Sequence, residues 1–561
     1  MLKLRILAVA LLSSTMLLIA SCADWRSYSY DSTHFSRQPS ESTLNASTVS
    51  TLHVIAPWPF VVPGGAALTA SPAVYDNTVY VGSLDGHFYA VWATGASQAT
   101  IRWQYPPVPA PGSPDACGIT SQPLVISPTV GSGNPSGPGI ASSASIVDSV
   151  AGHTAVMFGA PDPTSNGGDG RLWALDEATG HCIWKSDILA PVGDKAKIGY
   201  SSPVIAHNRA YVGISARIPD DITVGKLFAV MLADGHLDPG FHFSAVGGPG
   251  QTGGGGIWSS PAVTPSGNIV ITTGNSLLGD GVPAGVPNPD YTNSILKLDW
   301  TNGNVLWQVQ PVDVQHEHDA DYSASAIVGQ VSCGSLAISV QKDGWVHAVD
   351  IKNGGPFWNP SCSYAGHTGP GSGGLECPRW SFPTVASLPF TDDGHGDSHF
   401  KRPGALDGDH LFIAAGGLDL EPPPGHSVTQ VYNRLHSLNV CASDADRIRW
   451  ILPNLASNAG GVSVANGVIY LGTWDPFDTG GGAHHFYAIA DTDVIPPTSY
   501  VCSYPSLPSG FTCFMAGLRN VPVPSIVRDL TLIGSIQAVP AIVKAQVYVA
   551  TNAGYLYALG K

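Results

Sequence analysis

A three-part pattern of apolar and polar positions recurs along the chain. Each copy opens with a small residue and, usually, a proline before a β-branched segment, as in Ser71–Val74. A short apolar run that often ends in glycine follows, as in Val79–Gly82, and then a glycine-led alternating run such as Gly170–Leu175. Alternation with a period of two is typical of β-strands and not of helices. The pattern therefore predicts units of short strands joined by tight turns.

A tryptophan segment follows the third strand in several copies, after a polar turn such as Asp176–Gly180. Five tryptophans take this place in their copies: Trp103, Trp184, Trp307, Trp358 and Trp450. A four-stranded antiparallel unit cannot hide both of its faces alone, so neighbouring units must stack, and closure into a ring leaves few open edges. We therefore expect an all-β protein whose four-stranded antiparallel blades dock on one another through tryptophan.

Eight such units can be counted, beginning near residues 71, 121, 201, 259, 323, 404, 460 and 538. The last unit stops at Lys561, straight after its third strand, and the matching tryptophan segment is found at Leu52–Trp58 instead. We therefore expect an eight-bladed β-propeller in which the N-terminal strand completes the last blade and closes the ring. Residues 51–561 would form this single propeller, and residues 22–50 a tether and lead-in.

The composition agrees with a turn-rich β protein and excludes other classes. Gly (65) and Pro (46) make up about a fifth of the 561 residues, which is enough to punctuate many short strands. The 43% of apolar residues can bury a large core, which argues against disorder. The net charge of −16 disfavours nucleic-acid binding, because that function normally needs a basic surface.

The N-terminus carries an export signal. Lys3 and Arg5 precede an apolar stretch, and small residues follow it over Met1–Ser21. The tetrapeptide Ile19–Cys22 resembles the lipobox of bacterial lipoproteins, in which the cysteine becomes the lipid-bearing first residue. A plain signal peptide cleaved nearby is the alternative. We expect an exported protein anchored through lipid on Cys22, facing the periplasm or the cell exterior.

Eight cysteines remain when Cys22 is set aside. An even number in an exported protein favours disulfides, and two local pairs are preferred: Cys362 with Cys377, and Cys502 with Cys513. No C-x-x-C-H sequence is present, which excludes a covalently attached c-type haem. No C-x-x-C pair is present either, so a structural zinc site is not expected.

Several segments resemble the quinoprotein dehydrogenases. Asp24–Asp31 and Leu44–Leu52 are similar to the opening of that family. Four further segments are most similar to its polyvinyl-alcohol dehydrogenase branch, without the haem domain: Ile257–Val263, Thr273–Asn275, Asp319–Ser325 and Gln341–Asp350. The resemblance covers essentially the whole mature chain. It implies an eight-bladed propeller that binds pyrroloquinoline quinone (PQQ) together with a calcium or lanthanide ion.

Two positions carry over to the cofactor. Trp258 matches the tryptophan that forms the floor under the quinone ring, where an aromatic face gains from stacking on a flat cofactor. Lys342 matches a cation that hydrogen-bonds the quinone oxygens and stabilises negative charge during reduction. The alternatives are a tryptophan in the core of a blade and an exposed hairpin lysine.

Three positions bear on the metal ion and the chemistry. Asn275 matches an amide ligand of the metal, and Asp321 matches a carboxylate that both binds the metal and acts as catalytic base. A turn asparagine and a solvated acidic loop are the alternatives. The family's usual glutamate ligand is replaced by Ile218, which should weaken Ca²⁺ binding because affinity follows the charge of the ligands.

The resemblance implies an oxidoreductase that oxidises a small or polymeric alcohol by hydride transfer to PQQ. Electrons would pass to a separate cytochrome or membrane acceptor, because the chain has no haem motif of its own. The alternative is a non-catalytic propeller lipoprotein that binds proteins as a scaffold in the cell envelope, since one fold serves many functions. The set of Trp258, Asn275, Asp321 and Lys342 favours the enzyme, whereas Ile218 and the missing haem favour the scaffold.

Overall fold

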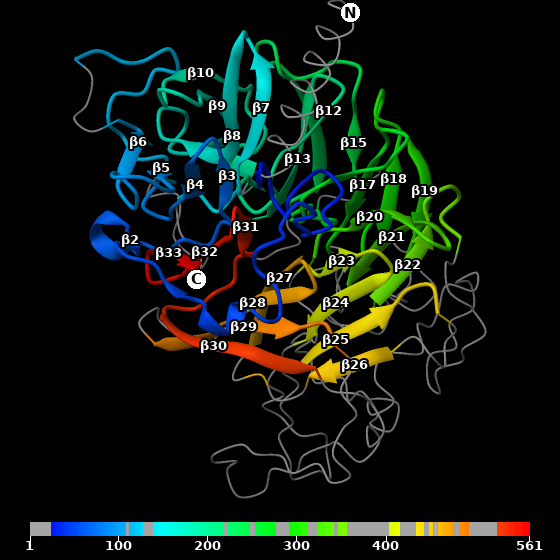
Figure 1. Cartoon of the computed structure of the whole chain (residues 1–561). Helices are drawn as coiled ribbons and strands as arrows, with labels where there is room; N and C mark the ends of the chain where they lie inside the picture. Colours follow the sequence, from blue (N-terminus) through cyan, green and yellow to red (C-terminus); the bar gives the residue numbers. More distant parts are fainter. Residues whose placement is uncertain are drawn as a thin grey trace, which may run out of the picture.

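The repeat folds into eight sheets around one axis, which confirms the predicted all-β, eight-bladed propeller (Figure 1). The computed structural model describes residues 24–107, 112–126, 139–194, 196–216, 223–246, 253–275, 291–310, 322, 324–340, 346–355, 403–415, 434–442, 448–452, 455, 458–474, 482–492 and 524–561. Within this part there is no α-helix, only the short 3-10 helices η1 (Val49–Thr51), η2 (Pro63–Gly65) and η3 (Val192–Asp194). None of these is long and apolar enough to cross a membrane.

Blades 1 to 4 follow in chain order, each with its innermost strand first. Blade 1 holds β3 (Ala73–Tyr75), β4 (Thr78–Gly82), β5 (Phe88–Trp92) and β6 (Ile101–Tyr105). Blade 2 holds β7 (Ser145–Val150), β8 (His153–Asp162), β9 (Asp169–Asp176) and β10 (Cys182–Lys185). Blade 3 holds β12 (Val204–Ala206), β13 (Arg209–Ala216), β14 (Lys226–Met231) and β15 (Phe243–Ser244), and β11 (Ala196–Lys197) also pairs with β13. Blade 4 holds β16 (Ala262–Val263), β17 (Ile269–Thr272), β18 (Ile295–Leu298) and β19 (Val305–Val309).

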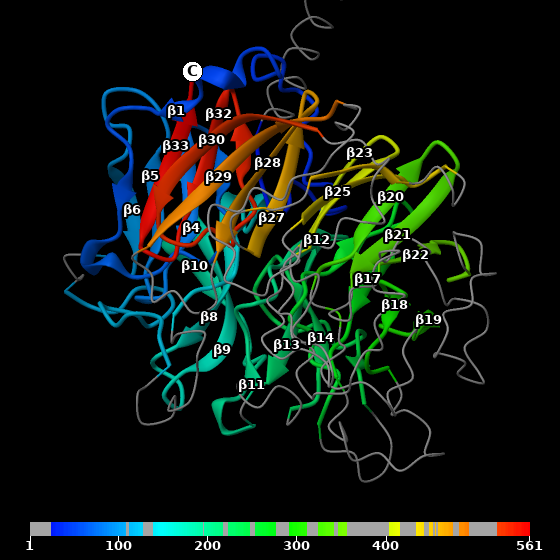
Figure 2. The ribbon, with the colours of Figure 1, turned by 90° about the horizontal axis from the view of Figure 1, so that it is seen from below.

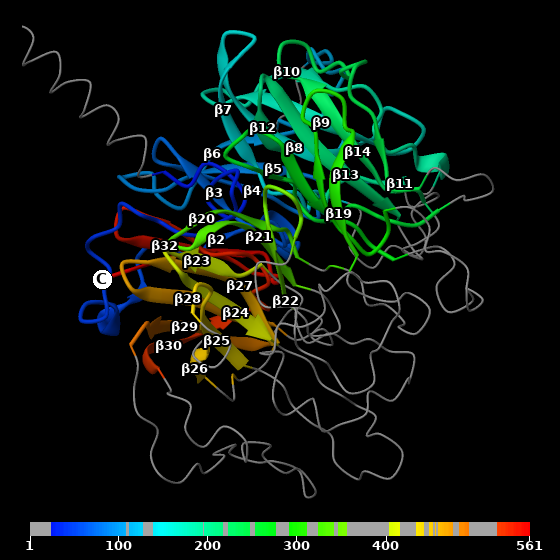
Figure 3. The ribbon, with the colours of Figure 1, turned by 90° about the vertical axis from the view of Figure 1, so that its right-hand side faces the viewer.

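Blades 5 to 8 complete the ring. Blade 5 has three strands among the described residues: β20 (Ile327–Val331), β21 (Gly334–Val340) and β22 (Val346–Asp350). Blade 6 holds β23 (Ala405–Asp407), β24 (His410–Ala415), β25 (Arg434–Asn439) and β26 (Ile448–Leu452). Blade 7 runs outward through β27 (Asn458–Ala465), β28 (Val468–Trp474), β29 (Ala483–Ala490) and β30 (Ser525–Ile533) (Figure 3). Blade 8 holds β31 (Ala541–Val543), β32 (Gln546–Ala550) and β33 (Tyr555–Gly560).

The N-terminal strand closes the ring, as the sequence predicts. In the antiparallel ladder, β1 (His53–Val54) pairs with the C-terminal end of β33, His53 opposite Gly560. A second short strand, β2 (Phe60–Val61), pairs with the beginning of β33, Phe60 opposite Leu556. Blade 8 therefore contains both ends of the propeller.

The tryptophan docking is confirmed on a glycine at three junctions, and at a fourth Trp450 of blade 6 donates its indole N–H to the Asp491 carboxylate of blade 7 at 2.9 Å. Trp103 of blade 1 donates its indole N–H to the carbonyl of Glu177 in blade 2 at 2.8 Å, and its ring lies on Gly180. A Cβ at Gly180 would stand 2.5 Å from that ring, so only glycine fits. The other two pairs are Trp184 on Gly235 and Trp307 on Gly354. Trp358 lies outside the described residues.

The second unit begins later than predicted. Its innermost strand starts at Ser145, not near residue 121. The segment Pro123–Val125 imitates the start of a blade, with proline before apolar residues. In the structure, however, the N–H of Leu124 bonds to the carbonyl of Gly86, in the turn between β4 and β5 of blade 1, at 2.8 Å. The loop between blades 1 and 2 is therefore longer than the repeat indicated.

Residues 24–38, here called the plug, lie at the centre of the ring (Figure 1). Their carbonyls accept hydrogen bonds of 2.7 to 2.9 Å from the innermost strands of blades 1, 2, 4, 5, 6 and 7, through the N–H groups of Val74, Ile146, Val263, Val328, Leu406 and Val464. The Gln38 amide reaches blade 8 by donating to the Ile542 carbonyl at 2.9 Å. The segment predicted as a tether is therefore part of the hub from Asp24 onward.

A ring of serines lies next to the plug along the same innermost strands. Each backbone N–H donates to the hydroxyl of the next blade at 2.8 to 3.0 Å, in the order Val539, Ser71, Ser143, Ser202, Ser260 and Ser325. We call the five serines the serine ring. In blades 1, 2, 4 and 5 the plug bonds three residues further along the chain than the serine, for example at Val74 after Ser71. The plug therefore occupies one end of the hub (Figure 2), and the residues before the serines occupy the other end.

Among the described residues, two disulfides join neighbouring blades. Cys117, in the loop after β6, pairs with Cys182 at the start of β10. Cys333, between β20 and β21, pairs with Cys441 beyond β25, so it ties blade 5 to blade 6. The two local pairs preferred from the sequence use other cysteines, and those lie outside the described residues.

Candidate functional site

The structure describes two of the positions carried over from the resemblance. Trp258 comes two residues before Ser260 of the serine ring, on the side away from the plug. Asn275 follows β17, the second strand of the same blade. Asp321, Lys342 and Ile218, and the predicted lipidation residue Cys22, lie outside the described residues.

Backbone hydrogen bonds bring the segments of Trp258 and Asn275 together. The N–H of Gly255 donates to the carbonyl of Asn275 at 2.7 Å, and the N–H of Gly274 donates to the carbonyl of Gly256 at 2.8 Å. Gly225 of blade 3 lies so near the carbonyl oxygen of Gly255 that a Cβ there would stand 1.8 Å from it. The glycine run therefore lets blades 3 and 4 close tightly before Trp258.

The indole of Trp258 is held by the next blade. Its Nε1–H donates to the carbonyl oxygen of Tyr322 at 2.9 Å, and the side chain is only partly buried. The Tyr322 side chain is fully buried and meets His347 edge to face, with 5.8 Å between ring centroids. Burial lowers the pKa of His347 to about 3, so this imidazole is neutral at pH 7. The indole of Trp258, predicted to lie under the quinone ring, is thus held at its N–H edge by Tyr322.

A cluster of hydroxyls joins blades 4 and 5 directly behind Trp258. The Thr272 hydroxyl lies 2.7 Å from the hydroxyl of Ser259 and 3.2 Å from the carbonyl oxygen of Ala324. Ser339 donates to the same Ala324 carbonyl at 3.0 Å. All three hydroxyl side chains are buried, and these bonds satisfy groups that would otherwise be costly to bury.

Each member of this cluster is a neighbour in sequence of one carried-over position. Ser259 adjoins Trp258, and Thr272 comes three residues before Asn275. Ala324 follows Asp321 by three residues, and Ser339 precedes Lys342 by three residues. The cluster therefore brings Ser259, Thr272, Ala324 and Ser339 together where blades 4 and 5 meet.

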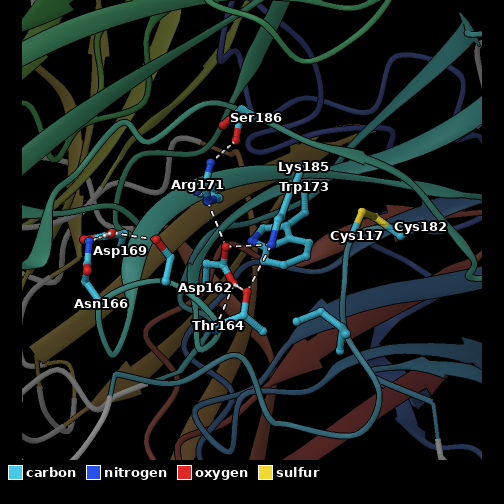
Figure 4. Close-up of polar contacts among 12 residues, drawn as sticks. Cys117, Asp162, Thr164, Asn166, Asp169, Arg171, Trp173, Cys182, Lys185 and Ser186 are labelled. Carbon is cyan, nitrogen blue, oxygen red and sulfur yellow. Dashed lines mark hydrogen bonds and ion pairs between the residues drawn. A yellow bond between two sulfur atoms is a disulfide. The ribbon is translucent and has the colours of Figure 1, made fainter. Parts of the chain in front are cut away.

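A second polar cluster lies at the end of β8 in blade 2 (Figure 4). It was not predicted from the sequence. The Asp162 carboxylate is fully buried and accepts hydrogen bonds from Arg171 Nε at 2.9 Å and Lys185 Nζ at 2.8 Å. Burial raises the pKa of Asp162, but bonds from Lys185 and Thr164 outweigh that effect and hold it below its ordinary value. The carboxylate is ionised and fully engaged, so the cluster ties strands together.

The hairpin beside this cluster is closed by another aspartate. Asp169 accepts from the Ser165 hydroxyl and the Asn166 amide, both at 2.7 Å, and from the N–H of Val192 at 2.7 Å. An Asp followed closely by Thr, Ser or Asn is a turn-forming pattern, and the run Asp162–Asn166 carries it. This signal in the sequence predicts a turn and not a functional site.

Trp258, among the described residues, suits an aromatic cofactor, whereas the predicted metal ligand Asp321 lies outside the described residues. Trp258 offers a partly exposed indole whose N–H is already bonded, which suits stacking on a flat ring. Asn275 supplies a neutral oxygen donor of the kind hard cations prefer. The part of the chain that the structure describes holds no group of three or more His, Cys, Asp or Glu able to bind a metal.

Comparison with known proteins is informative at the level of structure. No protein-family model and no curated protein matches the sequence. A europium-containing methanol dehydrogenase is similar with a TM-score of 0.66 and 14% identity, over 98% of this chain and 100% of that one. A quinohemoprotein alcohol dehydrogenase from Pseudomonas putida has a TM-score of 0.65 and 14% identity, over 98% of this chain and 81% of that one. Its counterpart from Comamonas testosteroni has a TM-score of 0.62 and 16% identity, over 96% and 81%.

Identities of 14 to 16% establish the fold and leave the chemistry to the residues themselves. The similarity spans nearly the whole chain, so it includes the hub as well as the blades. These similar structures are a methanol dehydrogenase and two quinohemoprotein alcohol dehydrogenases, and the eight-bladed propeller that the resemblance implies is confirmed in the fold.

Proposed function

We propose that the protein is a quinoprotein oxidoreductase that oxidises an alcohol by hydride transfer to PQQ. The observation that supports this most is the indole of Trp258, which is fixed through its N–H at the end of the hub opposite the plug. The proposal explains why an aromatic side chain is anchored there and yet stays partly exposed. Bound PQQ would supply a two-electron acceptor.

The residues of this chain would divide the work. Trp258 would form the floor of the cofactor site, and Lys342 would pair with the quinone oxygens. Asn275 and Asp321 would hold a Ca²⁺ or lanthanide ion through oxygen atoms. The Asp321 carboxylate would take the proton of the alcohol hydroxyl, which is the role of a general base. Electrons would then leave to a separate cytochrome or membrane acceptor.

The presence of Ile218 in place of a glutamate ligand predicts which metal ion the site should prefer. Replacing a glutamate ligand by isoleucine removes one negative charge from the site. Affinity for hard cations rises with ligand charge, so Ca²⁺ should bind weakly. A trivalent lanthanide gains more from each remaining oxygen ligand, so we expect it to be the better partner.

The position of the plug supports a specific attachment to the membrane. Cys22 is two residues from Asp24, where the plug begins, so a lipid on Cys22 would hold the plug end of the hub near the bilayer. The Trp258 end would then face away from the membrane, into the periplasm or cell exterior, where substrate and acceptor arrive. Radiolabelled palmitate should enter the wild-type protein and not Cys22→Ala.

A titration of the mature protein tests the proposed function. With La³⁺ or Ca²⁺ present, PQQ should quench tryptophan fluorescence saturably, and Trp258→Ala should abolish the quenching. Trp300→Ala is the matched control, because Trp300 is also partly buried but stacks on His207 outside the hub, with ring centroids 3.8 Å apart. Absence of binding with both ions would contradict the proposal and favour the scaffold.

A further inference from the structure

At four junctions, neighbouring blades meet on a glycine of one blade and an isoleucine of the next. The four pairs are Gly82 with Ile140, Gly159 with Ile198, Gly213 with Ile257, and Gly472 with Ile536. A Cβ at each glycine would stand 2.2 to 2.9 Å from a side-chain carbon of its isoleucine. The missing side chain therefore makes the room that the isoleucine fills.

The junction between blades 4 and 5 departs from this rule. In blade 1, Gly82 comes two residues after Tyr80, the ladder partner of Ala73. In blade 4 the same place, two residues after the partner of Ala262, is occupied by Thr272. Tyr322 comes three residues before Ser325, as Ile257 comes three residues before Ser260. A threonine and a tyrosine thus replace the glycine and the isoleucine.

The replacement changes what the junction does. Ile257 contributes only apolar packing from its side chain, whereas the Thr272 hydroxyl reaches the Ala324 carbonyl oxygen at 3.2 Å. This contact holds the backbone just beyond Tyr322. The Tyr322 ring is fully buried against blade 4 and His347, so the residue is fixed from both sides.

We infer that Tyr322 is a positioning residue that holds the indole of Trp258. Its carbonyl oxygen accepts the Trp258 Nε1–H at 2.9 Å. A shift of Tyr322 would therefore move the indole. The part of this inference that concerns PQQ binding rests on the proposed function.

The experiment follows Trp258 directly by ¹⁹F NMR of protein labelled with 5-fluorotryptophan, its resonance assigned with Trp258→Phe. Tyr322→Ile installs the residue used at the four glycine junctions, and it should shift the Trp258 resonance and raise the Kd for PQQ at least tenfold. Tyr322→Phe keeps the ring and should restore both. Ile198→Ala opens a comparable gap at a remote junction and should leave the Trp258 resonance in place.

The outcomes separate this inference from the proposed function. An unmoved Trp258 resonance in Tyr322→Ile overturns the inference, whatever PQQ does. A moved resonance in a protein that never binds PQQ supports the positioning and contradicts the dehydrogenase. If Tyr322→Ile does not fold, hydrogen exchange of the wild-type Trp258 indole N–H decides. Slow exchange is expected from its bond to Tyr322, and the rapid exchange of an exposed indole would overturn the inference.

Discussion

The two ends of the hub are built on different principles. At the plug end, most innermost strands bond to the plug through the same backbone position, so the contact is repeated around the ring. At the opposite end, the contacts of Trp258, Thr272 and Tyr322 are made by side chains that occur in one junction. Repeated backbone contacts tolerate many sequences, whereas the single set depends on particular residues.

This difference assigns separate roles to the two ends. The plug joins blades that are far apart in sequence, so it should act on the stability of the whole ring. Among the described residues, the contacts around Trp258 join blades 3, 4 and 5, so these residues should act on binding and contribute little to global stability. Substitutions at the two ends should therefore give opposite results in the same pair of assays.

Trp25→Ala should have the largest effect on stability. The Trp25 side chain is fully buried, and its backbone makes both hydrogen bonds of a bridge with Val74, at 2.9 and 2.7 Å. Loss of a buried tryptophan of this size costs about 3–5 kcal/mol. Denaturant unfolding should show the midpoint shift, while the Kd of the folded protein for PQQ stays within twofold of wild type.

Trp258→Ala is the reciprocal test. Because Trp258 is only partly buried, its removal should cost less stability than Trp25→Ala and yet abolish the PQQ signal. A large loss of stability in Trp258→Ala together with unchanged cofactor binding would show that the two ends do not have separate roles.

Much of the fold can be predicted from the sequence because the repeat depends on side chains of particular types. The docking of Trp103, Trp184 and Trp307 and the closure by β1 are confirmed, since each depends on residue types that recur at regular intervals. The late start of the second blade was missed because Pro123–Val125 imitates a blade start. The plug was missed because its contacts use backbone groups, which leave no pattern of residue types.

The candidate site is predicted only in part. The segments that hold Trp258 and Asn275 are joined by backbone hydrogen bonds, whereas the roles of Trp258, Asn275, Asp321 and Lys342 stay predictions. Tyr322 and Thr272 were not found because each was considered alone. Their signal is comparative, since they stand where four other junctions have glycine and isoleucine, which is visible only when the blades are aligned by register.

Acid should weaken the plug end through His34. This side chain is buried, with Nδ1 3.1 Å from the carbonyl oxygen of Ala326. Burial lowers its pKa to about 4, partly offset by that carbonyl. The folded state therefore binds fewer protons than the unfolded state, so the stabilisation is complete above pH 6.5 and is lost as pH falls toward 4. The loss amounts to at most about 3 kcal/mol.

Unfolding curves at several pH values check this effect. His34→Asn removes the titrating group and keeps a residue that tolerates the positive φ of 61° at this position. The variant should lose less stability than wild type between pH 6.5 and 4. A wild-type protein that is equally stable at both pH values would contradict the lowered pKa of His34, because the folded and unfolded states would then bind equal numbers of protons.

The serine ring lies between the two ends, so a pair of its members gives the finest comparison. Ser71→Ala leaves the N–H of Val539 without its acceptor, and Ser260→Ala does the same to the N–H of Ser202. An unsatisfied buried N–H costs about 1–3 kcal/mol, so both variants should lose similar stability by denaturant unfolding. Only Ser260 is two residues from Trp258, so only Ser260→Ala should also weaken PQQ binding, severalfold. Equal effects of the two variants on PQQ would mean that the cofactor senses the ring as a whole, and the separation of the two ends would then fail at the serine ring.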